Sequence, residues 1–226
     1  MNGVAVSGAT TSMESRALLS GGTSHAAIYA AVAELLRGTR ASTLVDVGCG
    51  RGELWPYVEE RCEHYVGIDA VAYEGFPAAG RLLRGDLDAS FPLGGAVADA
   101  VVSVETIEHL ENPRAFVREL VRIAVPGGLV IVTTPNQLSA LSLMTLLLRQ
   151  RFAAFQDVHY PAHRTALLEV DLRRIAAEAG LEQVRVSFSL GGRMPFTGRH
   201  YPRPLARRAP RLLSDTALLS GRRPLA

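Results

Sequence analysis

Three glycines stand at alternate positions directly after an apolar run. They are Gly48, Gly50 and Gly52, and the run covers residues 43–47. Because glycine lacks a Cβ, such a turn can take unusual dihedrals and lets a bulky cofactor lie against the main chain beside a helix N-terminus. A GxGxxG dinucleotide motif would need a glycine at position 53, which is Glu53. The spacing therefore favours a nucleotide-like ligand other than a nicotinamide dinucleotide.

An acid follows the next apolar run. Asp69 comes after residues 65–68 and seventeen positions after Gly52. An ionised carboxylate can accept hydrogen bonds from both hydroxyls of a ribose, as it does in dinucleotide-binding folds. The order of strand, glycine turn, helix, strand and acid predicts a nucleoside-binding site.

A third group of polar residues follows a later apolar run. Glu105, Glu108 and His109 have i, i+3, i+4 spacing, which projects side chains from one face of a helical turn. We expect all three to converge on a cleft, where His109 could take a proton from a hydroxyl or amine near neutral pH. The alternative interpretation is a helix cap with solvated acids.

The elements that must position these residues alternate along the chain. The candidate strands are 43–47, 65–68, 81–84, 98–104, 129–134 and 181–190. The candidate helices are 24–36 with Ser24 as cap, a segment ending at Cys62, 113–124, 138–148 and 167–179. Short apolar strands separated by helices predict a parallel sheet covered on both faces, with ligands at the carboxyl ends of the strands.

Composition predicts one globular domain. The chain has 226 residues, 48% of them apolar, and a net charge of +2. We therefore expect neither a disordered chain nor a surface dominated by charge of one sign. We divide it into a flexible arm at 1–22 and a single domain at 23–226. Within the domain, 136–166 is a lid-like insertion and 191–214 is an arginine-rich insertion in the last hairpin.

Cysteine and basic-residue usage indicate a cytoplasmic, bacterial protein. The two cysteines, Cys49 and Cys62, cannot form a disulfide scaffold, and no leader or membrane-spanning run is predicted. All 24 basic residues are arginine, as in proteins of G+C-rich bacterial genomes.

These motifs resemble the class I S-adenosylmethionine-dependent methyltransferases. VDVGCGRG at 45–52 is similar to the family's first motif, and VGIDA at 66–70 is similar to the end of its second strand. The match covers roughly residues 40–135. The resemblance implies a Rossmann-like three-layer α/β sandwich with a seven-stranded, mostly parallel sheet whose antiparallel last strand is 215–219.

The resemblance also implies a set of cofactor-binding residues. The three glycines would surround the amino-acid end of S-adenosylmethionine, Asp69 would hold its ribose, and Ala70 would lie beside the adenine. Asp86 and Leu87 would border the adenine, and Val104 and Glu105 would close the pocket. The full set is Asp46, Gly48, Cys49, Gly50, Gly52, Asp69, Ala70, Asp86, Leu87, Val104 and Glu105.

The expected reaction is an in-line displacement that moves a methyl group to a hydroxyl, or in second place an amine, of a small molecule. His109 and Glu108 are the candidate catalytic residues, with His109 as general base. Positioning an acceptor is worth up to about 7–11 kcal/mol, against about 10²- to 10⁴-fold in rate for a general base. Orientation should therefore outweigh the base.

The ExxEH segment resembles two subgroups. One comprises the ubiquinone-type and natural-product O-methyltransferases, in which EH borders the acceptor. The other comprises the small-RNA 3′-terminal 2′-O-methyltransferases, whose two Glu and two His bind a divalent metal. Here Glu105, Glu108 and His109 match that set, and His159 or His163 would be the fourth ligand. A third reading is a cofactor-binding protein without turnover.

The candidate partner is a small-molecule acceptor. Nucleic acid is disfavoured because the body of the chain has no basic platform with interleaved aromatics. The tail arginines from Arg199 to Arg211 could hold phosphates, but we favour a solvated arginine-rich loop. The apolar helix at 138–148 leaves peripheral membrane contact open. Monomer and homodimer remain open alternatives.

Overall fold

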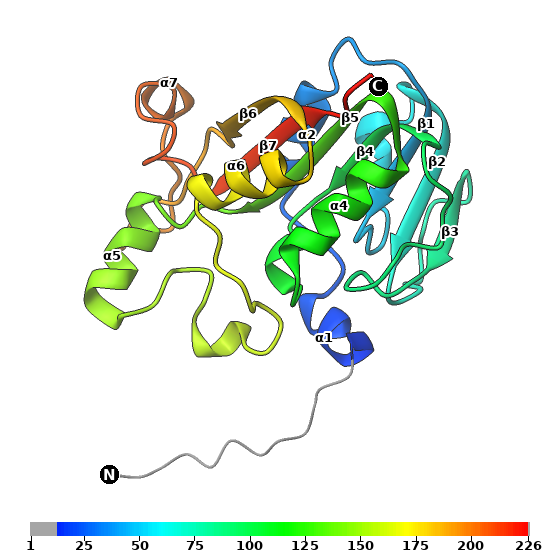
Figure 1. Cartoon of the computed structure of the whole chain (residues 1–226). Helices are drawn as coiled ribbons and strands as arrows, with labels where there is room; N and C mark the ends of the chain where they lie inside the picture. Colours follow the sequence, from blue (N-terminus) through cyan, green and yellow to red (C-terminus); the bar gives the residue numbers. More distant parts are fainter. Residues whose placement is uncertain (1–12, 226) are drawn as a thin grey trace.

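The computed structural model describes residues 13–225, which form a seven-stranded sheet with helices on both faces (Figure 1). The strands are β1 (Ala41–Val47), β2 (Cys62–Asp69), β3 (Gly80–Arg84), β4 (Ala98–Ser103), β5 (Ala124–Pro135), β6 (Glu182–Phe188) and β7 (Thr216–Arg222). Their order is β3-β2-β1-β4-β5-β7-β6; the first five are parallel, and β7 runs antiparallel to both neighbours. The predicted three-layer α/β fold is confirmed.

The remaining regular elements of the described residues are helices. They are α1 (Met13–Ser20), α2 (Ala26–Leu35), α3 (Trp55–Val58), α4 (Pro113–Ile123), α5 (Ala140–Arg149), α6 (Glu169–Glu178) and α7 (Arg203–Ala206), with 3₁₀ turns η1 (Ile107–His109) and η2 (Asp157–His159). Helices α4 and α6 pack on one face, and α2 and α3 pack on the other (Figure 1).

The sheet has a hydrophobic core on each face, because successive side chains of a β-strand point to opposite faces. Val45 and Val101 point to the side of α4, where they join Leu120 in one buried cluster. Leu44 and Val102, their neighbours along the strands, point to the opposite face and join the cluster under α2. Central strands that are apolar on both faces are typical of a parallel sheet between helix layers.

Two local predictions were wrong. The helix expected to reach Cys62 is a single turn, α3, and Cys62 already begins β2; Pro56 is tolerated because it lies in the first turn of the helix. Helix α2 is capped by His25 rather than by Ser24, since His25 Nδ1 accepts a hydrogen bond from Ala27 N–H at 3.2 Å.

Part of the predicted flexible arm is helical. Residues 13–20 form α1, while residues 1–12 of that arm lie outside the described residues. The Tyr73 hydroxyl donates to the Ala17 carbonyl at 2.6 Å, and Glu14 pairs with Arg84. An eight-residue helix is marginal alone, so contacts with distant parts of the chain stabilise α1, and its own sequence gave no sign of them.

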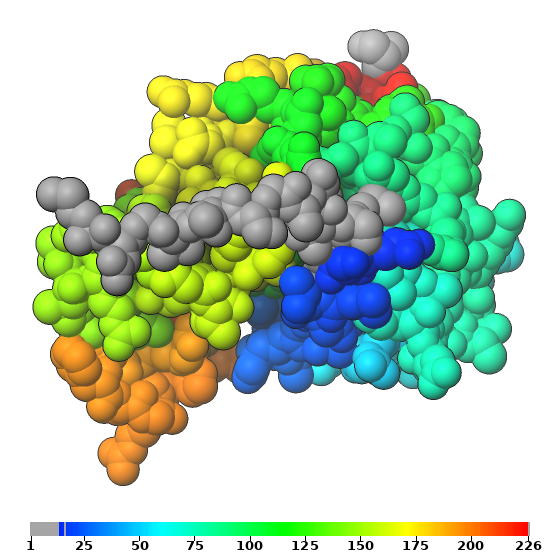
Figure 2. Space-filling view, turned by 90° about the horizontal axis from the view of Figure 1, so that it is seen from below, coloured from blue at the N-terminus to red at the C-terminus, as the bar shows by residue number. Residues whose placement is uncertain are grey.

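The sheet order places a topological switch point beside β1. From β1 the chain continues to β2 and β3 on one side of β1 and then crosses to β4 and β5 on the other side. The α/β sheets bind ligands at such a reversal of strand order. The stretches that follow β5 and β6 gather at one end of the molecule, lime and orange in Figure 2. They touch where Ala140 N–H donates to Leu212 O at 2.7 Å. Among the described residues, no helix has the length and apolarity needed to cross a bilayer.

Candidate functional site

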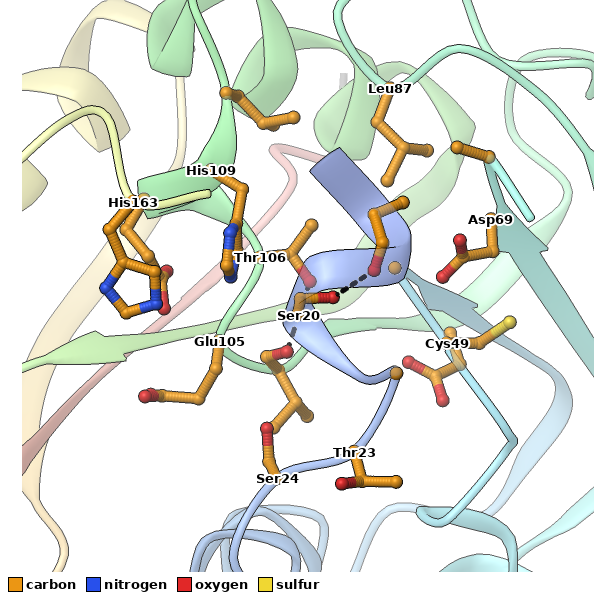
Figure 3. Close-up of a pocket in the computed structure, with 18 of the residues that line it drawn as sticks. Ser20, Thr23, Ser24, Cys49, Asp69, Leu87, Glu105, Thr106, His109 and His163 are labelled. Carbon is orange, nitrogen blue, oxygen red and sulfur yellow. Dashed lines mark hydrogen bonds between the residues drawn. The ribbon is translucent and has the colours of Figure 1, made fainter. Parts of the chain in front are cut away.

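A cavity of about 360 Å³ opens at the carboxyl ends of β1, β2 and β4. This volume lies within the range of small-molecule sites, about 300–1,000 Å³. Figure 3 shows Asp69 and Cys49 on one side of the cavity and Glu105, His109 and His163 on the other, with α1 across it. The predicted cofactor residues that line it are Asp46, Gly48, Cys49, Asp69, Ala70, Asp86, Leu87, Val104 and Glu105.

The three motif glycines do not share one role. Gly48 lines the cavity with φ +76°, and a Cβ there would lie 2.1 Å from Thr106 Oγ1. A Cβ on Gly50 would lie 2.1 Å from the Gly22 carbonyl oxygen, and one on Gly52 would lie 2.4 Å from Pro77. Gly50 and Gly52 are not in the lining of this cavity, and Gly22 and Pro77 pack against them. That they help to hold the cofactor stays a prediction.

Asp69 links the glycine turn to the second strand. Its Oδ2 accepts from Gly50 N–H at 2.8 Å and its Oδ1 from Val71 N–H at 3.1 Å. Each carboxylate oxygen can accept a second hydrogen bond, so these bonds orient the group and leave it able to accept more from a ligand. Burial raises the pKa of Asp69, and the backbone donors of Val71 and Gly50 oppose that rise.

Asp46 is a buried carboxylate with one oxygen unpaired. Its Oδ2 accepts from the Tyr65 hydroxyl at 2.6 Å, and its Oδ1 has no partner among the described residues. Burial raises the pKa of Asp46 to about 7. A buried unpaired acceptor carries a free-energy cost that a cationic ligand in the cavity would remove.

Glu105 and Glu108 occupy different backbone contexts. Glu105 follows β4 with φ +48°, so it stands before the turn η1 rather than on it. Glu108 is 1% exposed; its Oε2 accepts from the Thr134 hydroxyl at 3.2 Å, and its Oε1 has no partner among the described residues. Burial raises the pKa of Glu105 to about 7, and burial followed by repulsion from Glu105 raises the pKa of Glu108 well above its ordinary value.

Two imidazoles complete this side of the cavity. The Nδ1 atoms of His109 and His163 lie 3.0 and 2.6 Å from the carbonyl oxygens of Ala162 and Ala154. Since a carbonyl only accepts, each Nδ1 carries the hydrogen, and Nε2 is the basic nitrogen of the neutral ring. The ring centroids are 4.7 Å apart, and burial lowers the pKa of His163 to about 4.

Three of the candidate metal ligands converge. Ligand atoms of Glu108, His109 and His163 all lie within 4.8 Å of one another. Glu105 and His159 are not in this group; the His159 ring stacks on His163 instead, and its Nδ1 accepts from Gln156 N–H at 3.2 Å. The predicted four-ligand set is therefore only partly assembled.

Sequence reasoning missed the N-terminal wall of the cavity. Ala17, Ser20, Thr23, Ser24 and Tyr29 line it, although the first four are far in sequence from every motif. The first four have small side chains, which are typical of a linker, and no local pattern marks them as a wall.

A second cavity of about 630 Å³ adjoins the first. Both cavities are lined by His25, Ile28, Glu105 and His163. The second extends under the stretches that follow β5 and β6, where Gln137, Ser139 and Arg193 line it. Glu105 therefore lies where the two cavities adjoin.

The chain is similar to known methyltransferases in sequence. A sequence profile of the methyltransferase domain family matches residues 24–186. A probable S-adenosylmethionine-dependent methyltransferase of Mycolicibacterium smegmatis is 27% identical over 163 residues, 70% of this chain and 58% of that protein. A ubiquinone biosynthesis O-methyltransferase of Maricaulis maris is 29% identical over 105 residues, 42% of this chain and 41% of that protein. The chain thus spans about half the length of these curated relatives.

Solved structures share the fold. An S-adenosylmethionine-dependent methyltransferase of Archaeoglobus fulgidus superposes with a TM-score of 0.58 at 17% identity, covering 86% of this chain and 94% of that one. One of Mesorhizobium loti superposes with a TM-score of 0.57 at 17% identity, covering 91% and 100%. At 17% identity, these superpositions show that the fold is shared.

Proposed function

The chain belongs to the S-adenosylmethionine-dependent methyltransferase family, and from this premise we propose that it transfers a methyl group to a hydroxyl of a small-molecule acceptor. An amine is the second choice of nucleophile. The observation that carries the proposal is the pair of adjoining cavities that meet at Glu105, beside His109 and Glu108. One cavity suits the methyl donor and the other the acceptor.

The lining of the first cavity fits S-adenosylmethionine chemically. The unpaired Oδ1 of Asp46 suits the ammonium group of the amino-acid end, and the carboxylate of Asp69 suits the ribose hydroxyls. Leu87 and Ala70 supply apolar surface for the adenine, with Asp86 at its border. When bound, the cofactor supplies an electrophilic methyl group on a sulfonium.

The residues at the junction would position the acceptor and take its proton. His109 Nε2 is the proton acceptor, and the Ala162 carbonyl holds the ring by its Nδ1–H. Glu105, whose pKa is about 7, is ionised in part near neutral pH and favours positive charge beside it. Closing the junction to water under α1 and the lid-like stretch 136–166 would strengthen these interactions.

A second candidate function rests on the convergence of Glu108, His109 and His163. Carboxylate and imidazole ligands suit Mg²⁺, Mn²⁺ or Fe²⁺, which is the chemistry of metal-dependent methylation at an RNA 3′-terminal 2′-hydroxyl. Activity that survives a chelator and ignores RNA ends would remove this candidate. Loss of activity with EDTA and its return with Mn²⁺ would favour it.

Calorimetry tests the cofactor assignment directly. We expect S-adenosylhomocysteine to bind in the micromolar range and NAD to give no heat. In Asp69→Asn the amide oxygen can still accept from Gly50 N–H, but the bond from Val71 N–H to the other oxygen is lost, so thermal unfolding of the variant checks the fold. Loss of the charge should nevertheless weaken S-adenosylhomocysteine binding about tenfold or more, since hydrogen bonds to charged groups are worth about 1.5–3 kcal/mol. Binding of NAD alone would overturn the proposal.

An activity assay distinguishes an enzyme from the third reading, a cofactor-binding protein without turnover. Radiolabelled S-adenosylmethionine with a panel of phenols, catechols, sugars and amines should give labelled product. Cofactor binding without transfer to any member of the panel would favour the non-catalytic reading.

A further inference from the structure

The second cavity is walled on one side by the segment between β6 and β7. Residues 191–214 there contain a short hairpin in which Arg193 pairs with His200 across an isolated antiparallel bridge. Arg193, His200, Tyr201 and Arg203 from this segment all line the cavity. This segment therefore forms part of the wall that an acceptor would meet.

One of the two arginines is held in place by the protein. Asp215 Oδ2 accepts from both the main-chain N–H and the Nε–H of Arg193, each at 2.9 Å. Bound through Nε, the guanidinium keeps its two terminal NH₂ groups for a ligand. A planar fork fixed in this way is suited to bidentate binding of a carboxylate or phosphate.

The other arginine has no acidic partner among the described residues. Arg203 lines the cavity and has no ion-pair partner within 4.0 Å among residues 13–225. The acidic side chains in the lining are Glu105 and Asp215, and Asp215 is already bonded to Arg193. The guanidinium of Arg203 is therefore left to pair with a ligand.

A hydrogen-bond donor faces the same space from the N-terminal side. His25 Nδ1 accepts from Ala27 N–H, so its neutral ring carries the hydrogen on Nε2. The rings of His25 and His200 are 6.2 Å apart, which links the start of α2 to the hairpin. Donors from both ends of the chain thus line one cavity.

We propose that the acceptor bound in the second cavity carries an anionic group, a carboxylate or a phosphate monoester, which Arg193 and Arg203 hold while its nucleophile faces Glu105. This inference rests on the proposed function, because it assigns the second cavity to the acceptor. It commits to the charge of the acceptor, which the family membership leaves open.

The test compares three probes of similar shape on protein saturated with S-adenosylhomocysteine at low salt. The probes are benzoate, phenyl phosphate and the neutral benzamide, and calorimetry measures their dissociation constants. We expect at least one anion to bind about tenfold or more tightly than benzamide, as expected for charge-assisted hydrogen bonds. Preference for benzoate would identify a carboxylate acceptor, and preference for phenyl phosphate would identify a phosphate ester.

Variants locate the anion. Arg203→Gln should abolish the preference for the anion and leave benzamide binding unchanged, and Arg193→Gln should act in the same direction. The matched control is Arg208→Gln, an exposed arginine near α7 outside the cavity lining, which should bind all probes as the parent does. Thermal unfolding of each variant checks that the fold is kept.

The result separates this inference from the proposed function. Equal binding of anions and benzamide, no binding of any probe, or an equal effect of Arg203→Gln and Arg208→Gln overturns the anionic acceptor while S-adenosylhomocysteine binding still supports a methyltransferase. Failure to bind S-adenosylhomocysteine overturns the proposed function instead, and the probes can then be titrated into the protein alone.

Discussion

Three buried carboxylates line the first cavity although burial disfavours their charged forms. Burial raises the pKa of Asp46, Asp69 and Glu108, and one oxygen each of Asp46 and Glu108 has no partner among the described residues. Leaving buried polar groups unpaired costs about 1–3 kcal/mol each. Such a cost is characteristic of sites whose partners arrive with a ligand.

His109→Asn tests the proton acceptor with little structural change. The Asn side-chain amide can donate to the Ala162 carbonyl in place of Nδ1–H but has no basic nitrogen. We expect methyl transfer to fall about 10²- to 10⁴-fold while S-adenosylhomocysteine affinity stays within about twofold. Steady-state rates and calorimetry measure the two effects. A rate equal to that of the parent would show that positioning alone drives transfer.

Asp46→Asn tests the raised pKa of Asp46. The pKa is about 7 in the folded chain, against 3.8 ordinarily. Between these values the folded state binds a proton that the unfolded state has lost, so the free energy of unfolding falls as pH rises, by at most about 1.4 kcal/mol per pH unit. The Asn side chain can still accept from Tyr65 and does not titrate. Chemical denaturation from pH 4 to 8 should therefore show a shallower fall for the variant than for the parent.

A parallel fall in both proteins would contradict the buried, raised pKa of Asp46. The parent and the variant should both keep some slope, because the pKa values of Glu105 and Glu108 are raised in the same direction.

At the scale of elements, the glycine turn is shaped by neighbours from three other parts of the chain. Thr106 crowds Gly48, the main chain of Gly22 crowds Gly50, and Pro77 crowds Gly52. The turn is also hydrogen bonded to its surroundings, since Arg51 N–H donates to the Gly22 carbonyl at 3.1 Å. The segment before α2 therefore belongs to the site as much as the turn itself.

Gly48→Ala should destabilise the turn more than positive φ alone explains. Gly38 is the matched control, because its φ is +82° and a Cβ there meets nothing within 4 Å. Gly38→Ala should lower the free energy of unfolding by about 1–2 kcal/mol, the cost of left-handed backbone for a residue with a Cβ. Gly48→Ala adds the clash with Thr106 and should lose more stability, together with S-adenosylhomocysteine binding. Equal losses in denaturant titrations would contradict the crowding.

At the scale of the whole molecule, α1 is a wall of the cavity and no part of the two hydrophobic cores. None of the α1 side chains that the structure describes belongs to either buried cluster, whereas Ala17 and Ser20 line the cavity. Binding and folding should therefore respond differently to its removal.

Deletion of residues 1–20 tests this separation, with deletion of 1–12 as the matched control. The longer deletion removes α1 but keeps Gly22 against Gly50. We expect it to weaken S-adenosylhomocysteine binding about tenfold, a loss of about 1.4 kcal/mol, while the thermal midpoint changes little. The control deletion should leave affinity near that of the full chain. A large fall in the thermal midpoint would instead make α1 part of the folding core.

Agreement between sequence and structure is greatest where the pattern is local. The strands ending at Val47, Asp69 and Ser103 were predicted within a few residues, since an apolar run of strand length must be buried. Local pattern also brought Asp69 and Glu105 to the same edge of the sheet, because both follow parallel strands. The short helix α3 was overestimated because its length depends on packing.

The amino-acid sequence by itself determined the alternating α/β order, the glycine turn and the acids that follow the strands, since each depends on residues close together in the chain. Only the tertiary structure decided that α1 lines the cavity, that Gly22 and Pro77 pack against Gly50 and Gly52, and that His163 rather than His159 joins Glu108 and His109. These contacts join segments many residues apart, and their geometry depends on how the whole sheet and its helices pack.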